Sequence, residues 1–134
     1  MRPHEIWRHR LGTPVDDDEL VLAETDQRFN LGVGSTRSGR WILIEARSST
    51  TSEVHVIDAA DPTAPPRLVR ERVADVEYAI DDRGDDFVVL TNLDAPDFRV
   101  MTASHDAPDE WTELVAHEPG RRILQDVVTA IRHN

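Results

Sequence analysis

The stretch GVGSTRSG has the glycines and hydroxyls of a phosphate-binding loop. A P-loop has the pattern G-x-x-x-x-G-K-[ST], in which the lysine binds phosphate and the hydroxyl binds the metal ion. Gly34 and Gly39 have the glycine spacing, but Arg40 and Trp41 follow, so the hydroxyl ligand is missing. The dinucleotide pattern G-x-G-x-x-G and the esterase pattern G-x-S-x-G both fail at Arg37. A strand-like run follows instead of a helix, so we interpret residues 35–40 (STRSGR) as a turn.

Other residues that could do chemistry are scattered along the chain. The histidines are His4, His9, His55, His105, His117 and His133. None has another histidine four residues away, so the H-E-x-x-H pattern of zinc peptidases is absent. Acidic runs at residues 16–19 and 81–86 offer oxygen ligands for Ca²⁺ or Mg²⁺, but neither has EF-hand spacing. Both runs lie at expected turns, where aspartate bonds nearby backbone amides. We therefore predict no catalytic, cofactor-binding or metal-binding residue.

Composition limits the partners and the compartment. The 134 residues carry a net charge of −11, which argues against nucleic acid or an anionic membrane as a partner. The chain has no run of about 18 apolar residues that could span a membrane, and no visible secretory signal. It has no cysteine and hence no disulfide framework. We expect a cytoplasmic protein without a cofactor.

Short strands separated by turns account for most of the chain. Residues 41–46 (WILIEA) are apolar on both faces, as in a strand buried between two layers. Residues 52–58 (SEVHVID) alternate, as in a strand with two different faces. Further strands are predicted at residues 6–11, 19–24, 28–34, 67–70, 76–80, 87–92, 98–103 and 111–116. Three tryptophans are expected to fill gaps between packed sheets, which are the blades described next: Trp7, Trp41 and Trp111.

The strand pattern occurs twice. Gly39 aligns with Gly84, RWILIEAR with DFVVLTNL, and EVHVIDAADP with FRVMTASHDAP. This offset of about 45 residues is typical of β-propeller blades, which hold four strands each. We therefore predict an all-β fold with about two to three four-stranded antiparallel blades of an incomplete β-propeller. In this interpretation STRSGR and DDRGDD are the same turn in two blades, with glycine supplying a positive φ.

The repeat also predicts where each blade begins and ends. Residues 1–25 are assigned to the outer strands of a preceding blade, and residues 26–72 to one complete blade. Residues 73–119 form the second blade, and residues 120–134 form the start of a further blade. This last segment is ambiguous, because its apolar residues also fit the spacing of a helix.

The stretches RFNLGVGSTRSGR and TTSEVHVID carry the most specific part of a family resemblance. With nearly all of the remaining chain, including VEYAIDDRGDDFVVLTNLDAPDFRVMTA, they resemble the N-terminal propeller of the oligopeptidase B (protease II) group. This group belongs to the prolyl oligopeptidase family of serine peptidases. The resemblance implies a seven-bladed propeller that covers an α/β-hydrolase domain. It also implies that only short peptides are admitted, and that they are cut after Arg or Lys.

No part of this chain resembles the hydrolase domain, which follows the propeller in this family. The Ser-Asp-His triad and its G-x-S-x-G pattern belong to that domain, so the resemblance assigns no catalytic residue here. We expect a fragment of a larger serine peptidase that is inactive alone. Its partners would be the missing propeller blades and the hydrolase domain. The alternative is a stand-alone small β-rich binding or interaction module built from blade repeats.

The acidic charge suggests how the intact enzyme would attract its substrate. Carboxylates on inner strands, which would line the propeller channel, would draw in short cationic peptides by electrostatic steering. Glu77 and Asp126 are the candidates.

The absence of the other propeller blades from this chain predicts that it self-associates. Two blades alone leave apolar faces such as Ile42/Ile44 and Val88/Leu90 without neighbours. Exposed faces and strand edges bind other chains, so we expect the fragment to self-associate.

Overall fold

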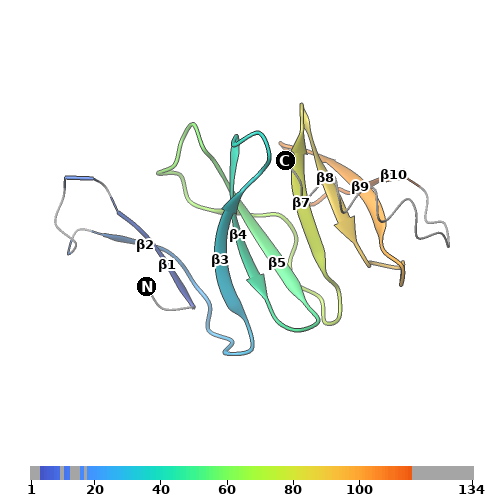
Figure 1. Cartoon of the computed structure of the whole chain (residues 1–134), viewed down its shortest axis with the longest axis horizontal. Helices are drawn as coiled ribbons and strands as arrows, with labels where there is room; N and C mark the ends of the chain where they lie inside the picture. The colour runs from blue at the N-terminus through green and yellow to red at the C-terminus, as the bar shows by residue number, and fades with distance from the viewer. Residues whose placement is uncertain (1–3, 10, 13–15, 17, 116–134) are drawn as a thin grey trace.

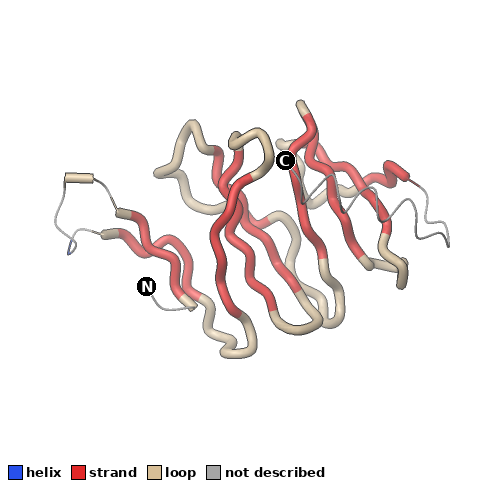
Figure 2. The backbone as a smooth tube through the Cα atoms, in the orientation of Figure 1, coloured by secondary structure: helices blue, strands red, loops and turns tan. Residues whose placement is uncertain are grey.

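The described part of the chain is built from β-strands. The computed structural model describes residues 4–9, 11–12, 16 and 18–115, and Figure 2 shows strands and loops in this part. No helix in the described part is long and apolar enough to cross a membrane. Most strands lie where the sequence predicts them, because branched and aromatic residues alternate there between polar turns.

Three antiparallel sheets follow one another along the chain (Figure 1). The hairpin sheet consists of β1 (Glu5–Arg8) and β2 (Glu19–Ala23). The first sheet has the order β3-β4-β5-β6 and consists of β3 (Asn30–Ser35), β4 (Trp41–Arg47), β5 (Ser52–Asp58) and β6 (Arg67–Leu68). The second sheet has the order β10-β9-β8-β7 and consists of β7 (Tyr78–Arg83), β8 (Asp86–Thr91), β9 (Arg99–Ser104) and β10 (Thr112–Val115). The predicted all-β fold of antiparallel four-stranded units is confirmed.

The segment predicted to begin a further blade, residues 120–134, lies outside the described residues. The two four-stranded sheets fall within the predicted blades 26–72 and 73–119, and the hairpin sheet falls within residues 1–25. The blade boundaries themselves stay a prediction.

The predicted turn STRSGR is confirmed except for Ser35, which ends β3; the preceding residues 32–34 also belong to β3. The turn connects β3 to β4, and the Thr36 amide donates to the Trp41 carbonyl at 3.0 Å. The Gly39 amide donates to the Thr36 carbonyl at 2.9 Å, and Gly39 has a φ of 75°. Gly84 has a φ of 62° in the corresponding turn of the second sheet. Both glycines therefore adopt a backbone conformation that other residues rarely reach.

The acidic run at residues 81–86 is shorter as a turn than the sequence predicts. β7 continues through Arg83, which pairs with Asp86 of β8, so only Gly84 and Asp85 connect the strands. The expectation of a turn across the whole run is wrong for Asp81 and Asp82. Their carboxylates are hydrogen-bonded within the protein, which removes the cost of placing aspartate in a strand.

The main core lies between the two four-stranded sheets. Its buried residues are Leu43, Val54, Val56, Val69, Tyr78, Ile80, Phe87, Val89 and Met101. Trp41 and Trp111 pack against this cluster, which confirms that these two fill space between sheets. Trp7 is 42% exposed, so the same expectation is wrong for it. Trp7 alternates with the buried Ile6, so its ring lies on the other face of the hairpin sheet, which no described sheet covers.

A smaller core lies between the hairpin sheet and the first sheet. Ile6, Ile44 and Ile57 are buried there, and Val21, Leu22, Leu31 and Ile42 pack against them. The expectation that the Ile42/Ile44 face lacks a neighbour is therefore wrong, because β1 and β2 cover it. Val88 and Leu90 alternate with the buried residues of β8 and are half-buried on the opposite face of the second sheet.

Tyr78 joins the two four-stranded sheets through polar bonds inside the main core. Its hydroxyl accepts from the Val54 amide at 2.8 Å and donates to the Arg70 carbonyl at 2.7 Å. Its own amide donates to the Ser52 hydroxyl at 2.7 Å, and that hydroxyl donates to the Tyr78 carbonyl at 3.0 Å. The side chain is only 4% exposed, so water cannot replace these partners.

We predict that Tyr78→Phe lowers the free energy of unfolding by about 1–3 kcal/mol, because the Val54 amide and the Arg70 carbonyl lose a buried partner. Urea denaturation of the chain measures this change. The control is Ser49→Ala, which removes an exposed hydroxyl from the β4–β5 turn and should change stability by less than about 0.5 kcal/mol. Equal stability of Tyr78→Phe and the parent chain would contradict the prediction.

Candidate functional site

β3 and β7 are the strands whose position makes them candidates for contact with a ligand. Each lies at one end of its four-stranded sheet, so no described strand pairs with its outer edge. Each is also the first strand of its repeat. We call β3 and β7 the edge strands.

Glu77, one of the two predicted channel residues, lies immediately before the edge strand β7. Its amide donates to Asn92 Oδ1 at 2.8 Å, and its carbonyl accepts from Thr91 Oγ1 at 2.8 Å. These bonds fix the backbone of Glu77 against the end of β8, while its side chain is half-buried. The other predicted residue, Asp126, lies outside the described residues.

A shallow groove of about 290 Å³ runs along the edge strand β3. It is lined by Asn30, Leu31, Gly32, Val33, Glu45 and Arg47. Arg47 Nε donates to Glu45 Oε2 at 2.8 Å, so the polar side of the groove is an ion pair on β4. Val33 is 57% exposed on the same strand.

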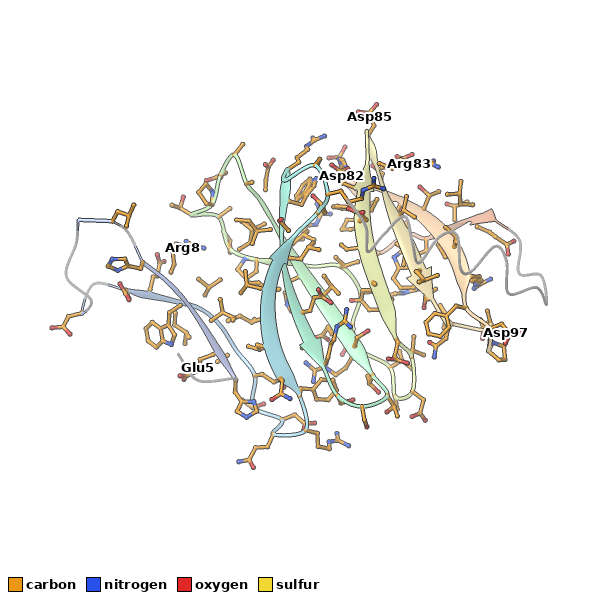
Figure 3. All side chains as sticks on the ribbon, in the orientation of Figure 1. Glu5, Arg8, Asp82, Arg83, Asp85 and Asp97 are labelled. Carbon is orange, nitrogen blue, oxygen red and sulfur yellow. The ribbon has the colours of Figure 1, made fainter. Side chains whose placement is uncertain are left out.

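A hydrogen-bonded serine, aspartate and histidine meet where the two four-stranded sheets contact each other. Ser38 Oγ donates to Asp82 Oδ2 at 2.7 Å, and His105 Nε2 lies 3.0 Å from Asp82 Oδ1. The Asp82 side chain is 3% exposed, and the His105 ring packs against Trp41 and Phe87. Figure 3 shows Asp82 near the end of β7, close to Arg83 of the same strand and to Asp85 in the turn that follows. We call Ser38, Asp82 and His105 the junction.

The junction lacks the arrangement of a nucleophile and its base. In a serine hydrolase the histidine must receive the proton of the serine hydroxyl, so those two side chains must be in contact. Here the carboxylate lies between them and accepts from both. The junction therefore holds two sheets together. The sequence did not indicate it because Ser38 and His105 lie 44 and 23 residues from Asp82, respectively.

The acidic runs have protein partners. Asp81 accepts from the Arg37 amide at 2.8 Å, which adds a second bond beside the junction. Asp18 bonds to His9, and Glu19 lies 3.6 Å from Arg8. Figure 3 places Arg8 on the hairpin sheet, far from the second sheet. Among the described residues, no group of three or more histidine, aspartate or glutamate side chains could hold a metal ion.

Arg72 forms the centre of a second polar cluster, beside the first sheet. Its guanidinium binds Glu24 and also Glu53, the latter at 2.9 Å, and lies 3.9 Å from the centre of the Phe29 ring. Burial by itself would raise the pKa of Glu53, but hydrogen bonds from Arg72 hold that pKa below its usual value. Arg72 thus ties the segment before β3 to β5 and to the segment after β6.

The remaining histidines are placed separately. Burial lowers the pKa of His55, and its Nδ1 has no hydrogen-bond partner among the described residues. His4 Nδ1 lies 2.8 Å from the Phe29 carbonyl. His117 and His133 lie outside the described residues. Of the six histidines, His105 alone is brought together with a serine and a carboxylate in the described part of the chain.

Comparison with known proteins agrees with this architecture. Residues 2–131 match the model of the prolyl oligopeptidase N-terminal beta-propeller domain. Protease 2 of Moraxella lacunata is 41% identical over 100 residues, which cover 75% of this chain and 14% of that protein. Dipeptidyl aminopeptidase BI of Pseudoxanthomonas mexicana is 41% identical over 116 residues, which cover 84% of this chain and 16% of that protein.

Solved structures give the same result. Oligopeptidase B from Trypanosoma brucei, with covalently bound antipain, matches with a TM-score of 0.79 and 32% identity over 88% of this chain and 17% of that one. Oligopeptidase B from Leishmania major matches with a TM-score of 0.79 and 26% identity over 86% of this chain and 17% of that one. The chain thus spans about a sixth of the length of these relatives. With a model match across almost its whole length, this chain belongs to the prolyl oligopeptidase N-terminal β-propeller family.

Proposed function

We propose that this chain is part of the substrate-gating propeller of an oligopeptidase B-like serine peptidase that cleaves short peptides after Arg or Lys. The observation that carries the proposal is the pair of four-stranded antiparallel sheets, which superposes on oligopeptidase B with a TM-score of 0.79. The 41% identity to Protease 2 of Moraxella lacunata supports the same group.

On this proposal the chain forms part of the propeller, and another domain carries the catalytic residues. The partners are the missing blades and an α/β-hydrolase domain that carries the Ser-Asp-His triad. The chain alone is inactive, because the junction of Ser38, Asp82 and His105 has its carboxylate in the middle and gives the serine no base. We further propose that the intact enzyme works in the cytoplasm.

The preference for Arg and Lys rests on charge. The chain has a net charge of −11, and Glu77 lies immediately before the edge strand β7. Because blades surround a central channel, a carboxylate beside the first strand of a blade would face arriving peptides. A negative channel raises the local concentration of cationic peptides and speeds their capture.

We also propose that the isolated chain self-associates. The face of β8 that carries Val88 and Leu90 is half-buried, and the described part of β3 has a free edge. Apolar faces and free edges bind further chains. In the intact enzyme, a neighbouring blade would cover the face of β8.

The native protein is expected to be several-fold larger than the 15.2 kDa of this chain. Blotting extracts of the source cells with an antibody to the chain measures its size. The same antibody should deplete the activity that cleaves short Arg-containing peptides. A band at 15.2 kDa with no loss of that activity would refute the peptidase proposal and favour a stand-alone binding module.

Replacement of Glu77 in the full-length enzyme tests electrostatic steering. Glu77→Gln should lower kcat/KM for Arg-containing peptides about two- to fivefold at low salt, and the difference should vanish at high salt because ions screen the attraction. Glu110→Gln is the control, because Glu110 is exposed in the loop before β10, at the other edge of the second sheet. Equal loss in both variants, or a loss that salt does not reduce, contradicts a role of Glu77 in steering.

Sedimentation velocity tests self-association of the chain. The parent chain should sediment as a dimer or larger species as its concentration rises, and Leu90→Arg should shift it towards the monomer by placing a charge on the half-buried face. Leu11→Arg is the control, because Leu11 is already 90% exposed and should leave association unchanged. A stable monomer at high concentration of the parent chain would contradict the proposal.

A further inference from the structure

The free edge of β3 carries unpaired backbone groups in a regular order. The Thr36 amide donates to the Trp41 carbonyl, so Thr36 and Trp41 are a hydrogen-bonded pair of the β3–β4 ladder. Such pairs alternate along an antiparallel ladder, so Gly34 and Gly32, which pair with Leu43 and Glu45, also bond to β4. The amides and carbonyls of Leu31, Val33 and Ser35 therefore point to the free edge, where no described strand meets them.

Gly32 leaves an opening beside this edge. A methyl group added at Gly32 would meet no atom within 4 Å, and Gly32 does not have a positive φ. Neither the packing of the described residues nor backbone conformation thus requires glycine there, although glycine weakens a strand. Glycine inside a strand often marks a place where a ligand or another backbone approaches closely.

The Glu45 carboxylate lies beside the open space at Gly32. Glu45 is the cross-strand partner of Gly32, so both lie on the same face, and Glu45 lines the groove. A strand added at the free edge would lie two strand spacings, about 10 Å, from β4. Because Gly32 has no side chain, a long side chain opposite it on the added strand can extend over position 32 and reach Glu45. A larger residue at position 32 would block this path.

We propose that the free edge of β3 binds an extended cationic peptide as an additional antiparallel strand, with an arginine opposite Gly32 reaching Glu45. The backbone groups of Leu31, Val33 and Ser35 bond to the peptide main chain, which is how extended peptides add to a sheet edge. Glu45 already accepts from Arg47 through Oε2, so the peptide arginine would bond to the second carboxylate oxygen, Oε1. The net charge of −11 favours a cationic peptide over a neutral one. This inference rests on the proposed gating function, because it gives passing peptides a place to dock in the propeller.

The geometry predicts which peptide amides matter. A residue opposite Gly32 occupies a non-hydrogen-bonded position, because Gly32 bonds to β4, so its own amide points away from β3. The amides of the neighbouring peptide residues point towards β3. The probe is an N-acetylated, C-amidated hexapeptide in which arginine alternates with threonine, labelled for fluorescence anisotropy with the 134-residue chain.

N-methylation tests this register. Methylation of the threonine amides should weaken binding about tenfold or more, because it removes the donors to β3. Methylation of the arginine amides should change affinity less than about twofold. If both methylated peptides bind as tightly as the parent peptide, or both lose affinity equally, strand addition in this register is overturned.

Two substitutions test the opening with a matched control. Gly32→Val should weaken binding of the probe peptide about tenfold, because the valine side chain fills the space through which the peptide arginine reaches Glu45. Thr112→Val introduces the same side chain at an exposed position of β10, in the second sheet and away from β3, and should leave affinity unchanged. Thermal unfolding should show both variants folded, since valine favours strands. Equal affinity of Gly32→Val and the parent chain overturns the proposal.

The Glu45 contact is tested with a neutral peptide. Citrulline has the shape of arginine without its charge, so the citrulline peptide should bind the parent chain about three- to tenfold more weakly. Glu45→Gln should abolish this difference, and a difference that persists overturns the assignment of Glu45. Failure of all peptides to bind overturns this inference alone, because the size and activity of the native protein test the peptidase proposal separately.

Discussion

The fold depends on the mutual burial of two sheet faces that neither sheet can cover alone. The first sheet contributes Leu43, Val54 and Val56, and the second contributes Phe87 and Val89, to one dry layer between them. A four-stranded sheet in isolation would leave such a face in water, at a cost of about 25 cal/mol for each Å² of apolar surface. Stacking of the sheets therefore sets the positions of all other parts, including the turns at their ends.

Packing of the two sheets also buries polar groups, and these groups form hydrogen bonds from one sheet to the other. Tyr78 joins the sheets in the middle of the layer, and the junction of Ser38, Asp82 and His105 joins them at one end. The cost of an unpaired buried carboxylate explains why Asp82 has partners from two other segments. A serine, an aspartate and a histidine in contact are thus a structural feature here, because the order of their contacts gives the hydroxyl no base.

The same stacking leaves the edge strands open. Each sheet pairs its strands in chain order, so the first strands, β3 and β7, and the last strands, β6 and β10, have one side unpaired in the described part of the chain. In the proposed propeller the first strands would surround the channel, where backbone groups meet solvent or a passing ligand. On the proposed function, this part of the propeller supplies surfaces along the path of the substrate, whereas the reacting groups come from another domain.

The sequence by itself determined the strands, the turns and the family. Alternation in SEVHVID and the doubly apolar WILIEA set β5 and β4, because strand periodicity is local, and glycine at Gly39 and Gly84 set the turns through positive φ. Tertiary structure alone decided that β1 and β2 cover Ile44, that Trp7 is exposed, and that Asp82 meets Ser38 and His105. These outcomes depend on which faces of separate sheets come together. No local pattern encodes that choice, because it follows from the total surface that the assembled sheets bury.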